Sequence, residues 1–205
     1  TTLFRSRTIW AGGGNDQLTG GSLGRTSNGA FLEIFRGNAG NDVINGNNAY
    51  SDGDRASSDR ADYSNNTSSQ AINVNLATGV ASDGLGGTDT LIDINQVNGG
   101  AGNDIITGGS LGDIIDGGAG NDTLDGGIGT PNTVRYQQAT AGVIVNLSSS
   151  AITVDTSANT VTGMTGIKTV AATSANDGMS GTDTLYRFAN IQGSDYNDYL
   201  KGSDF

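Results

Sequence analysis

The chain has 205 residues, of which 34 are glycine, and its formal net charge is −11 at pH 7. It contains no His and no Cys, which excludes disulfides, thiol chemistry, His-based zinc centres and Ser–His nucleophile pairs. The acidity argues against nucleic acid and anionic membranes as partners, and no apolar run approaches the roughly 20 residues that cross a membrane, so membrane insertion is not expected.

Low hydrophobicity and glycine spacing together predict an all-β fold. Only 34% of the residues are hydrophobic, and no stretch keeps a 3.6-residue apolar period between its glycines, so essentially no helix is expected. Because the chain starts TTLFRS without an initiator Met, residues 1–10 are expected to be a non-native or disordered end. Residues 11–205 are expected to form a single elongated region that is truncated inside a further repeat at the C-terminus.

The first repeat occupies residues 11–25, AGGGNDQLTGGSLGR, and places Asp16 in a glycine-rich turn. It matches residues 99–113 at 10 of 15 positions. Arg25 stands where the later copy has Asp113, and a guanidinium cannot coordinate a cation. Any cation site at Arg25 is therefore expected to be lost or replaced by the arginine charge.

A second repeat, GNAGNDVIN at residues 37–45, is centred on Asp42. Asparagine and aspartate are favoured in turns because their side chains hydrogen-bond the local backbone. A plain turn role therefore explains Asp16 and Asp42 as well as metal coordination does, and both interpretations stay open.

Two longer segments, 84–108 and 178–202, align without gaps, and both carry the sequence GTDTL. An alternating strand pattern precedes each of them, at residues 72–76 and 143–147. The second copy has about 23 extra residues between that strand and GTDTL, which are expected to form a loop or an additional coil. These segments predict longer spacer coils on the same axis as the repeats.

Four residues of these spacers are candidates for binding. Asp89 and Asp183 lie in the GTDTL sequences, where turn capping is favoured over metal binding. Tyr63 and Tyr136 precede the two strand patterns, and packing against the coil is favoured over a carbohydrate platform.

Three nine-residue units stand end to end at residues 99–125, GGAGNDIIT, GGSLGDIID and GGAGNDTLD. Glycines allow tight turns, and the remainder of each unit is long enough for one short strand. Two successive units make one flattened coil, so aspartates that are two units apart lie on the same edge. Asp104 and Asp122 are therefore expected to stack, and Asp113 lies on the opposite edge.

Stacked carboxylates beside backbone carbonyls are unfavourable unless a hard cation lies between the layers. Calcium takes six to eight oxygen ligands in flexible geometry, whereas magnesium requires a tighter octahedron and zinc prefers His or Cys. Calcium is therefore the predicted cofactor. The alternative is a metal-free solenoid in which Asn and Asp only form turns.

A last, degenerate unit, GSDYNDYLK, occupies residues 193–201 around Asp198. Asp195 and Tyr196 replace the usual small residue and glycine, which weakens the case for a metal at Asp198.

The nonapeptide units and the GTDTL spacers resemble the repeats-in-toxin (RTX) calcium-binding regions of secreted bacterial proteins. The resemblance covers nearly all of residues 11–205 and implies a right-handed parallel β-roll, in which calcium is held between turns by aspartates and backbone carbonyls. It implies a site at Asp104 and Asp122, whereas Asp113 would need an aspartate at position 131, where the chain has Pro131. The candidate metal-site residues are Asp104, Asp122, Gly100, Gly102, Asn103, Gly118, Gly120, Asn121, Asp113, Asp16, Asp42 and Asp198.

The predicted function is that of a calcium-binding module that folds on extracellular calcium and supports secretion and folding of a larger exported protein. The resemblance implies a secreted, extracellular location and type I secretion machinery as a partner. Two alternatives stay open: a calcium-rigidified adhesin spacer or glycan- or cell-surface-binding repeat, and an accessory region of a secreted enzyme. Catalysis within this chain is not expected.

Overall fold

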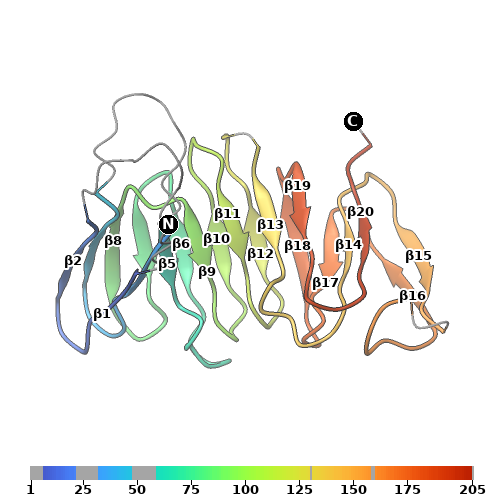
Figure 1. Ribbon diagram of the computed structural model, residues 1–205, viewed down its shortest axis with the longest axis horizontal. Helices are drawn as coiled ribbons and strands as arrows, with labels where there is room; N and C mark the ends of the chain where they lie inside the picture. The colour runs from blue at the N-terminus through green and yellow to red at the C-terminus, as the bar shows by residue number, and fades with distance from the viewer. Residues whose placement is uncertain (1–6, 22–31, 48–58, 130, 158–159, 205) are drawn as a thin grey trace, which may run out of the picture.

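A computed structural model describes residues 7–21, 32–47, 59–129, 131–157 and 160–204. Within these ranges the chain forms β-strands, turns and bends, and it has no helix, as predicted. Most strands belong to two long sheets, and they stack side by side along the long axis of the molecule (Figure 1). No described helix is long and apolar enough to span a membrane.

The first sheet has seven strands, all parallel where they pair. In sheet order they are β1 (Arg7–Trp10), β3 (Glu33–Arg36), β5 (Arg60–Asp62), β9 (Gln96–Asn98), β11 (Ile114–Asp116), β13 (Thr133–Arg135) and β19 (Asn190–Gln192).

The second sheet has eleven strands and mixes parallel with antiparallel pairs. In sheet order they are β2 (Gln17–Thr19), β4 (Val43–Asn45), β8 (Thr88–Ile92), β7 (Val80–Ser82), β6 (Asn73–Asn75), β10 (Ile105–Thr107), β12 (Thr123–Asp125), β18 (Thr182–Tyr186), β17 (Ser174–Asn176), β14 (Ile144–Asn146) and β20 (Tyr199–Lys201).

The core lies between the two sheets and is filled by the middle residue of each short strand. Ile106, Ile115 and Leu124, from three successive repeats, are completely buried. Their neighbours along a strand point outward because strand side chains alternate, so Ile105 stays 47% exposed. One repeat buries a single apolar side chain, and stability therefore comes from stacking the coils.

Each coil of the repeats consists of two nine-residue units, as predicted. Ile105 pairs with Thr123 in the second sheet, and Gln96 pairs with Ile114 in the first. The next coil is one residue longer, because Ile114 pairs with Thr133.

The spacers differ from the coils that the sequence predicts. In the first spacer β7 runs antiparallel to both β6 and β8, and in the second β17 runs antiparallel to both β14 and β18. Each spacer therefore adds a three-stranded antiparallel excursion to the second sheet. Consequently β8 stacks on β4, and β18 stacks on β12.

The extra residues of the second spacer form a hairpin of β15 (Ile152–Asp155) and β16 (Ile167–Val170), at the far end of the molecule (Figure 1). The hairpin has a small core of its own, in which Val154, Val161 and Val170 pack with Ile144 of β14.

Residues 7–10, expected to belong to a disordered end, form β1 and pair with β3. Exposure alternates along this strand, since Thr8 and Trp10 are exposed and Ile9 packs against the core, so the roll begins before residue 11. Residues 1–6 and Arg25 lie outside the described residues.

Candidate calcium sites

One long edge of the roll collects aspartates that lie just before, or at the second residue of, strands of the second sheet. Most lie where the chain passes from the first sheet to the second, whereas Asp89 and Asp183 lie in β8 and β18, which follow another strand of the second sheet. The acidic edge comprises Asp16, Asp42, Asp89, Asp104, Asp122, Asp183 and Asp198.

Hydrogen bonds from backbone to side chain join successive aspartates of this edge. The N–H of Asp104 donates to Oδ1 of Asp122 at 2.8 Å, and the N–H of Asp122 donates to Oδ1 of Asp183 at 3.0 Å. A second column repeats the pattern from Asp16 to Asp42 and from Asp42 to Asp89, at 2.8 and 3.0 Å. The predicted stacking of Asp104 on Asp122 is thus confirmed, and the structure also brings Asp16 and Asp42 together.

Asp113 lies on the opposite edge, as predicted, but its partner is not Pro131. Its N–H donates to Oδ1 of Asn132 at 3.0 Å, because this coil is one residue longer than the coil between Asp104 and Asp122. The partner is therefore a neutral amide. Its Nδ2 donates to the carbonyl oxygen of Gly129, which leaves the Asp113 layer with one carboxylate.

Asp198 lies on the acidic edge without an aspartate beside it. Its Oδ1 accepts a hydrogen bond from the N–H of Val143 at 2.9 Å, and its Oδ2 accepts one from the N–H of Ser194 at 2.8 Å. The Ser194 hydroxyl donates to Oδ1 as well. Both oxygens of Asp198 thus have protein donors, as expected of a turn residue.

The inner oxygens of several other aspartates have no partner. Oδ2 is buried without a hydrogen bond in Asp42, Asp122 and Asp183. Oδ2 of Asp104 differs, because it accepts the N–H of Gly100 at 2.9 Å. Buried polar atoms almost always have partners in folded proteins, and a buried carboxylate without one is costly unless it binds a proton or a cation.

Burial raises the pKa of these carboxyl groups. It raises the pKa of Asp104 to about 6. The pKa of Asp122 rises to about 8, through burial first and then through the nearby carboxylate of Asp183. Asp183 itself has a pKa of about 7, again chiefly because of burial. The stacked carboxylates are therefore held as anions only with difficulty unless a positive charge accompanies them.

The glycines of the repeats supply oxygen donors beside these carboxylates. A Cβ placed on Gly99 would lie 2.1 Å from the carbonyl oxygen of Gly117 and 2.4 Å from Oδ2 of Asp104. The bare glycine therefore leaves a space that both oxygens face. In the same way, Gly118 and Gly120 (φ +88° and +120°) approach the carbonyl oxygens of the turn before them, which belong to Gly100 and Gly102.

The side chains of the repeat asparagines accept hydrogen bonds from the backbone of the adjacent turn. Oδ1 of Asn103 accepts the N–H of Asn121 at 2.9 Å, and Oδ1 of Asn121 accepts the N–H of Thr182 at 2.9 Å. Their side-chain oxygens thus hold adjacent turns in register.

Carboxylate oxygens beside backbone carbonyls are the donors that calcium prefers, so these residues fit the ion. Within the described residues no group of three or more acidic side chains forms a ready-made metal site. A cation at Asp104 and Asp122 would therefore draw on the glycine carbonyls as well as on the carboxylates.

Arginines balance other buried acids, at the ends of the first-sheet strands. Nη2 of Arg36 lies 3.1 Å from Oδ2 of Asp62, and Nε of Arg135 lies 3.5 Å from Oδ2 of Asp116. Burial opposes ionisation of Asp62, but hydrogen bonds from Ser64 and Arg36 outweigh it and lower its pKa. Among the described residues no Lys or Arg forms such an ion pair with the acidic edge.

Asp83 and Asp177 are buried acids that the sequence analysis did not select. Both are fully buried, and Oδ2 of each has no hydrogen-bond partner. A signal was present, because they occupy the same place one residue before the two aligned spacer segments. Tyr63 and Tyr136 are buried, as predicted, and the Tyr63 hydroxyl donates to Oδ2 of Asp89 at 2.9 Å.

Comparison with known proteins places the repeats in a family. The RTX calcium-binding nonapeptide repeat matches in four copies, at residues 8–22, 28–49, 91–110 and 98–130. A search of curated proteins and a search of solved structures found no match. The chain therefore carries RTX calcium-binding nonapeptide repeats, a class of repeat whose cofactor is Ca²⁺ and which forms a parallel β-roll.

Proposed function

We propose that the chain is a calcium-dependent folding module of a larger exported protein, disordered in the cell and ordered by extracellular calcium. The acidic edge supports the proposal most strongly. Five of its aspartates are buried, Oδ2 has no partner in Asp42, Asp122 and Asp183, and no described Lys or Arg forms an ion pair with the edge. Such an edge favours folding only when a cation is present.

The free energy that calcium adds to folding follows from the linkage between binding and folding. Calcium sites of extracellular modules have Kd values of roughly 10⁻⁴–10⁻³ M. A site that exists only in the folded state contributes about 2.7 kcal/mol when calcium is at 100 times Kd, and almost nothing at a tenth of Kd. Several coupled sites would therefore leave the chain unfolded at cytosolic calcium concentrations and fold it into the roll at extracellular ones.

The glycine content acts in the same direction. Glycine loses more backbone entropy on folding than other residues do, and 34 glycines with a net charge of −11 oppose the compact state. Secretion to an extracellular location and use of type I secretion machinery belong to this proposal, since export of an unfolded chain and folding outside need such a switch.

The test is a calcium titration followed by far-ultraviolet circular dichroism. In chelator we expect little ordered structure, and in millimolar calcium a cooperative gain of β signal. Magnesium at the same ionic strength is the control, and it should give a much smaller gain. Identical spectra in chelator and in calcium would overturn the proposal.

A second candidate is a calcium-rigidified adhesin spacer. The elongated stack of coils favours it, because such an array holds its two ends apart (Figure 1). A glycan or cell-surface partner belongs to this candidate. Binding of the calcium-loaded chain to cells or glycans, lost in chelator, would favour it over a pure folding module.

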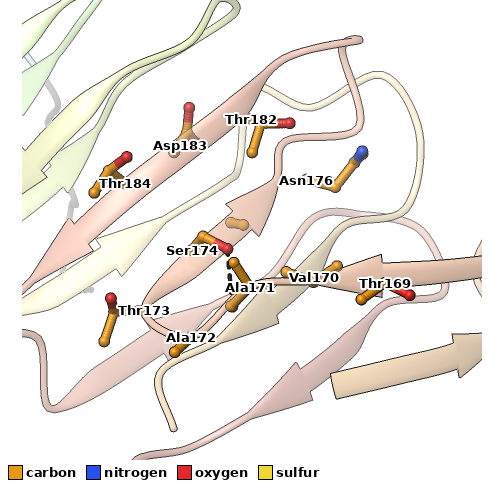
Figure 2. Close-up of a pocket in the computed structure, with 11 residues that line it drawn as sticks. Thr169, Val170, Ala171, Ala172, Thr173, Ser174, Asn176, Thr182, Asp183 and Thr184 are labelled. Atoms are coloured by element: carbon orange, nitrogen blue, oxygen red, sulfur yellow. Dashed lines mark hydrogen bonds between the residues drawn. The ribbon is translucent and has the colours of Figure 1, made fainter. Parts of the chain in front are cut away.

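We propose no catalytic role for this chain, and an accessory role beside a separate enzyme domain fits it equally well. A pocket opens beside β17 and β18 and is lined by residues 169–176 and 182–184 (Figure 2). Its lining offers hydroxyl groups, an amide and a single carboxylate, that of Asp183, which is fully buried. Hydrolase assays on the calcium-loaded chain would test the proposal.

A further inference from the structure

A pocket lies where the hairpin of the second spacer meets the second sheet. In the first spacer residues 76–79 join β6 directly to β7, whereas in the second the hairpin of β15 and β16 is inserted between β14 and β17. The end of β16 and the strands β17 and β18 line a cavity of about 460 Å³ (Figure 2). This volume is typical of sites that bind small ligands.

The polar groups of this pocket are uncharged, and several have no protein partner. Among the described residues, four hydroxyl groups and one amide nitrogen of the lining make no hydrogen bond. They belong to Thr169, Thr173, Thr182, Thr184 and Asn176. The lining contains no Lys or Arg, and its one acidic side chain, that of Asp183, is fully buried. The pocket therefore offers free neutral donors and acceptors to a ligand.

The lining differs from the corresponding surface of the first spacer. Ser174 pairs with β18 in the same register as Val80 pairs with β8, so a hydroxyl group replaces an exposed aliphatic side chain. Tyr186 ends β18 at the place where Ile92 ends β8. The polar lining and the aromatic ring thus occur in the spacer that carries the hairpin, although both excursions have the same strand pairing.

Thr173 has a backbone conformation that its side chain disfavours. Its φ is +49°, in the left-handed region, where the first spacer has Gly79 at +69°. The two residues correspond, because the carbonyl oxygen of Gly79 accepts the N–H of Leu91 and that of Thr173 accepts the N–H of Leu185. A β-branched residue is rarely found in this region, and such strained residues cluster at functional sites. Here the strained residue contributes its hydroxyl to the pocket.

Tyr186 extends the surface of the pocket along β18. It is 49% exposed and lies on the same face of the strand as Thr182 and Thr184, because strand side chains alternate. Two residues along a strand place it roughly 7 Å from Thr184. The adjacent Arg187 forms an ion pair with Asp125, so the charges beside the ring balance each other.

We propose that this pocket binds a neutral glycan, with Tyr186 as a stacking platform at its edge. Sugar hydroxyls both donate and accept hydrogen bonds, as the free threonine hydroxyls of the lining do. The C–H face of a sugar ring is apolar and packs on an aromatic ring. Residues 169–186, which build the site, lie outside the segments that match the repeat family.

Other classes of ligand fit the pocket less well. An acidic ligand finds no cation in the lining, and the net charge of −11 repels it. A lipid needs large apolar side chains, whereas the apolar lining consists of Val170 and alanines. The inference deepens the second candidate function, because it assigns a ligand class and a surface to an adhesin spacer. It rests on the proposed function in one respect, that calcium must order the chain before the pocket forms.

The test applies the full chain in saturating calcium to an array of immobilised neutral oligosaccharides of glucose, galactose, mannose and N-acetylglucosamine. Acidic oligosaccharides from alginate are the comparison on the same array. We expect binding to at least one neutral class and none to the acidic one. A chain that is folded by circular dichroism and binds no neutral oligosaccharide would overturn the inference, while the calcium-dependent module stands. Identical spectra in chelator and in calcium would overturn the proposed function, and the array would still decide the glycan site.

The double variant Thr182→Val, Thr184→Val locates the binding. Valine keeps the β-branched shape that suits a strand and removes two free hydroxyls, so folding should be retained. The Kd for the oligosaccharide selected on the array, measured by titration calorimetry, should rise about tenfold, as expected for the loss of two hydrogen bonds.

Thr88→Val, Thr90→Val is the matched control, because these threonines hold the same places in the first spacer and alternate in exposure in the same way. The control should leave Kd unchanged, and equal Kd values for the two double variants would overturn the inference. Tyr186→Ala changes an exposed side chain outside the core and should also weaken binding about tenfold through lost stacking. Unchanged affinity in this variant would overturn the role of Tyr186 as a platform.

Discussion

The N–H of Asp104 donates a 2.8 Å hydrogen bond to Oδ1 of Asp122, one coil further along the roll. Asp122 therefore takes part in two such bonds. Its Oδ1 accepts the N–H of Asp104, and its own N–H donates to Oδ1 of Asp183. In the folded chain this bond holds the carboxylates of adjacent layers in register, and it makes the energetics of the edge testable.

Replacement of Asp104 and Asp122 together by Asn should abolish most of the calcium-induced folding. The bonds to Oδ1 remain, so the variant loses the ion, which contributes about 2.7 kcal/mol at 100 times Kd for one site, together with the bond from the N–H of Gly100 to Oδ2 of Asp104. Circular dichroism in a calcium titration measures the midpoint, which should move to higher calcium. Asp155→Asn is the control, because Asp155 is exposed on β15 and its Oδ1 also accepts a backbone N–H, that of Ser157 at 2.9 Å. An unmoved midpoint in the double variant would show that the ion lies elsewhere.

Acidity should replace calcium in part. Asp104, Asp122 and Asp183 have raised pKa values of about 6, 8 and 7 in the folded chain, against about 4 when unfolded. A raised pKa favours the folded state below the unfolded value, and that contribution is lost as pH rises through the folded value. In chelator the roll should therefore be more stable at pH 5 than at pH 8, as measured by thermal melts.

Calcium should reverse this trend, because it competes with the same protons. The affinity for calcium should rise between pH 6 and pH 8, measured by titration calorimetry in two buffers to count released protons. Affinity that does not change over this range would contradict ion binding by these carboxylates.

Alanine at Gly120 should destabilise the roll by more than about 1 kcal/mol. Gly120 has φ +120°, and a Cβ there would lie 2.2 Å from the carbonyl oxygen of Gly102. Gly12→Ala is the matched control, because a Cβ at Gly12 meets no atom within 4 Å. Urea midpoints in saturating calcium compare the two, and equal midpoints would contradict the close approach of adjacent turns.

Alanine at Ile106 should cost about 2–5 kcal/mol, whereas alanine at the adjacent Ile105 should cost much less. Ile106 is completely buried between the sheets, and Ile105 is 47% exposed on the outer face. Urea unfolding in calcium measures both. Similar losses would mean that the second sheet is registered one residue away from the arrangement described.

The sequence predicted the features of the fold that follow from the nine-residue repeat. The spacing of two complete units between Asp104 and Asp122 specifies their stacking, because two units make one coil. The same reasoning failed at Asp113, since one added residue in the next coil replaces Pro131 by Asn132 as the partner. Local pattern cannot reveal such a change of length.

The spacers show the other limit. Alternating apolar residues predict strands at 72–76 and 143–147, but alternation does not encode whether a strand is parallel or antiparallel to its neighbour. The excursions were therefore expected to be coils. Asp83 and Asp177 stand at the same place before the two aligned segments, but the alignment does not show that the antiparallel turn buries them.

The stacking of β8 on β4 has a consequence for the order of assembly. Val43 pairs with Thr90, and Thr123 pairs with Thr184, so each of these pairs joins strands that are far apart in the sequence. The coils therefore cannot be added one after another along the chain, as in a simple zipper, because two layers stay open until a distant strand returns. Closing such long loops has an entropic cost, so assembly should proceed in blocks, with one slow closure at each spacer.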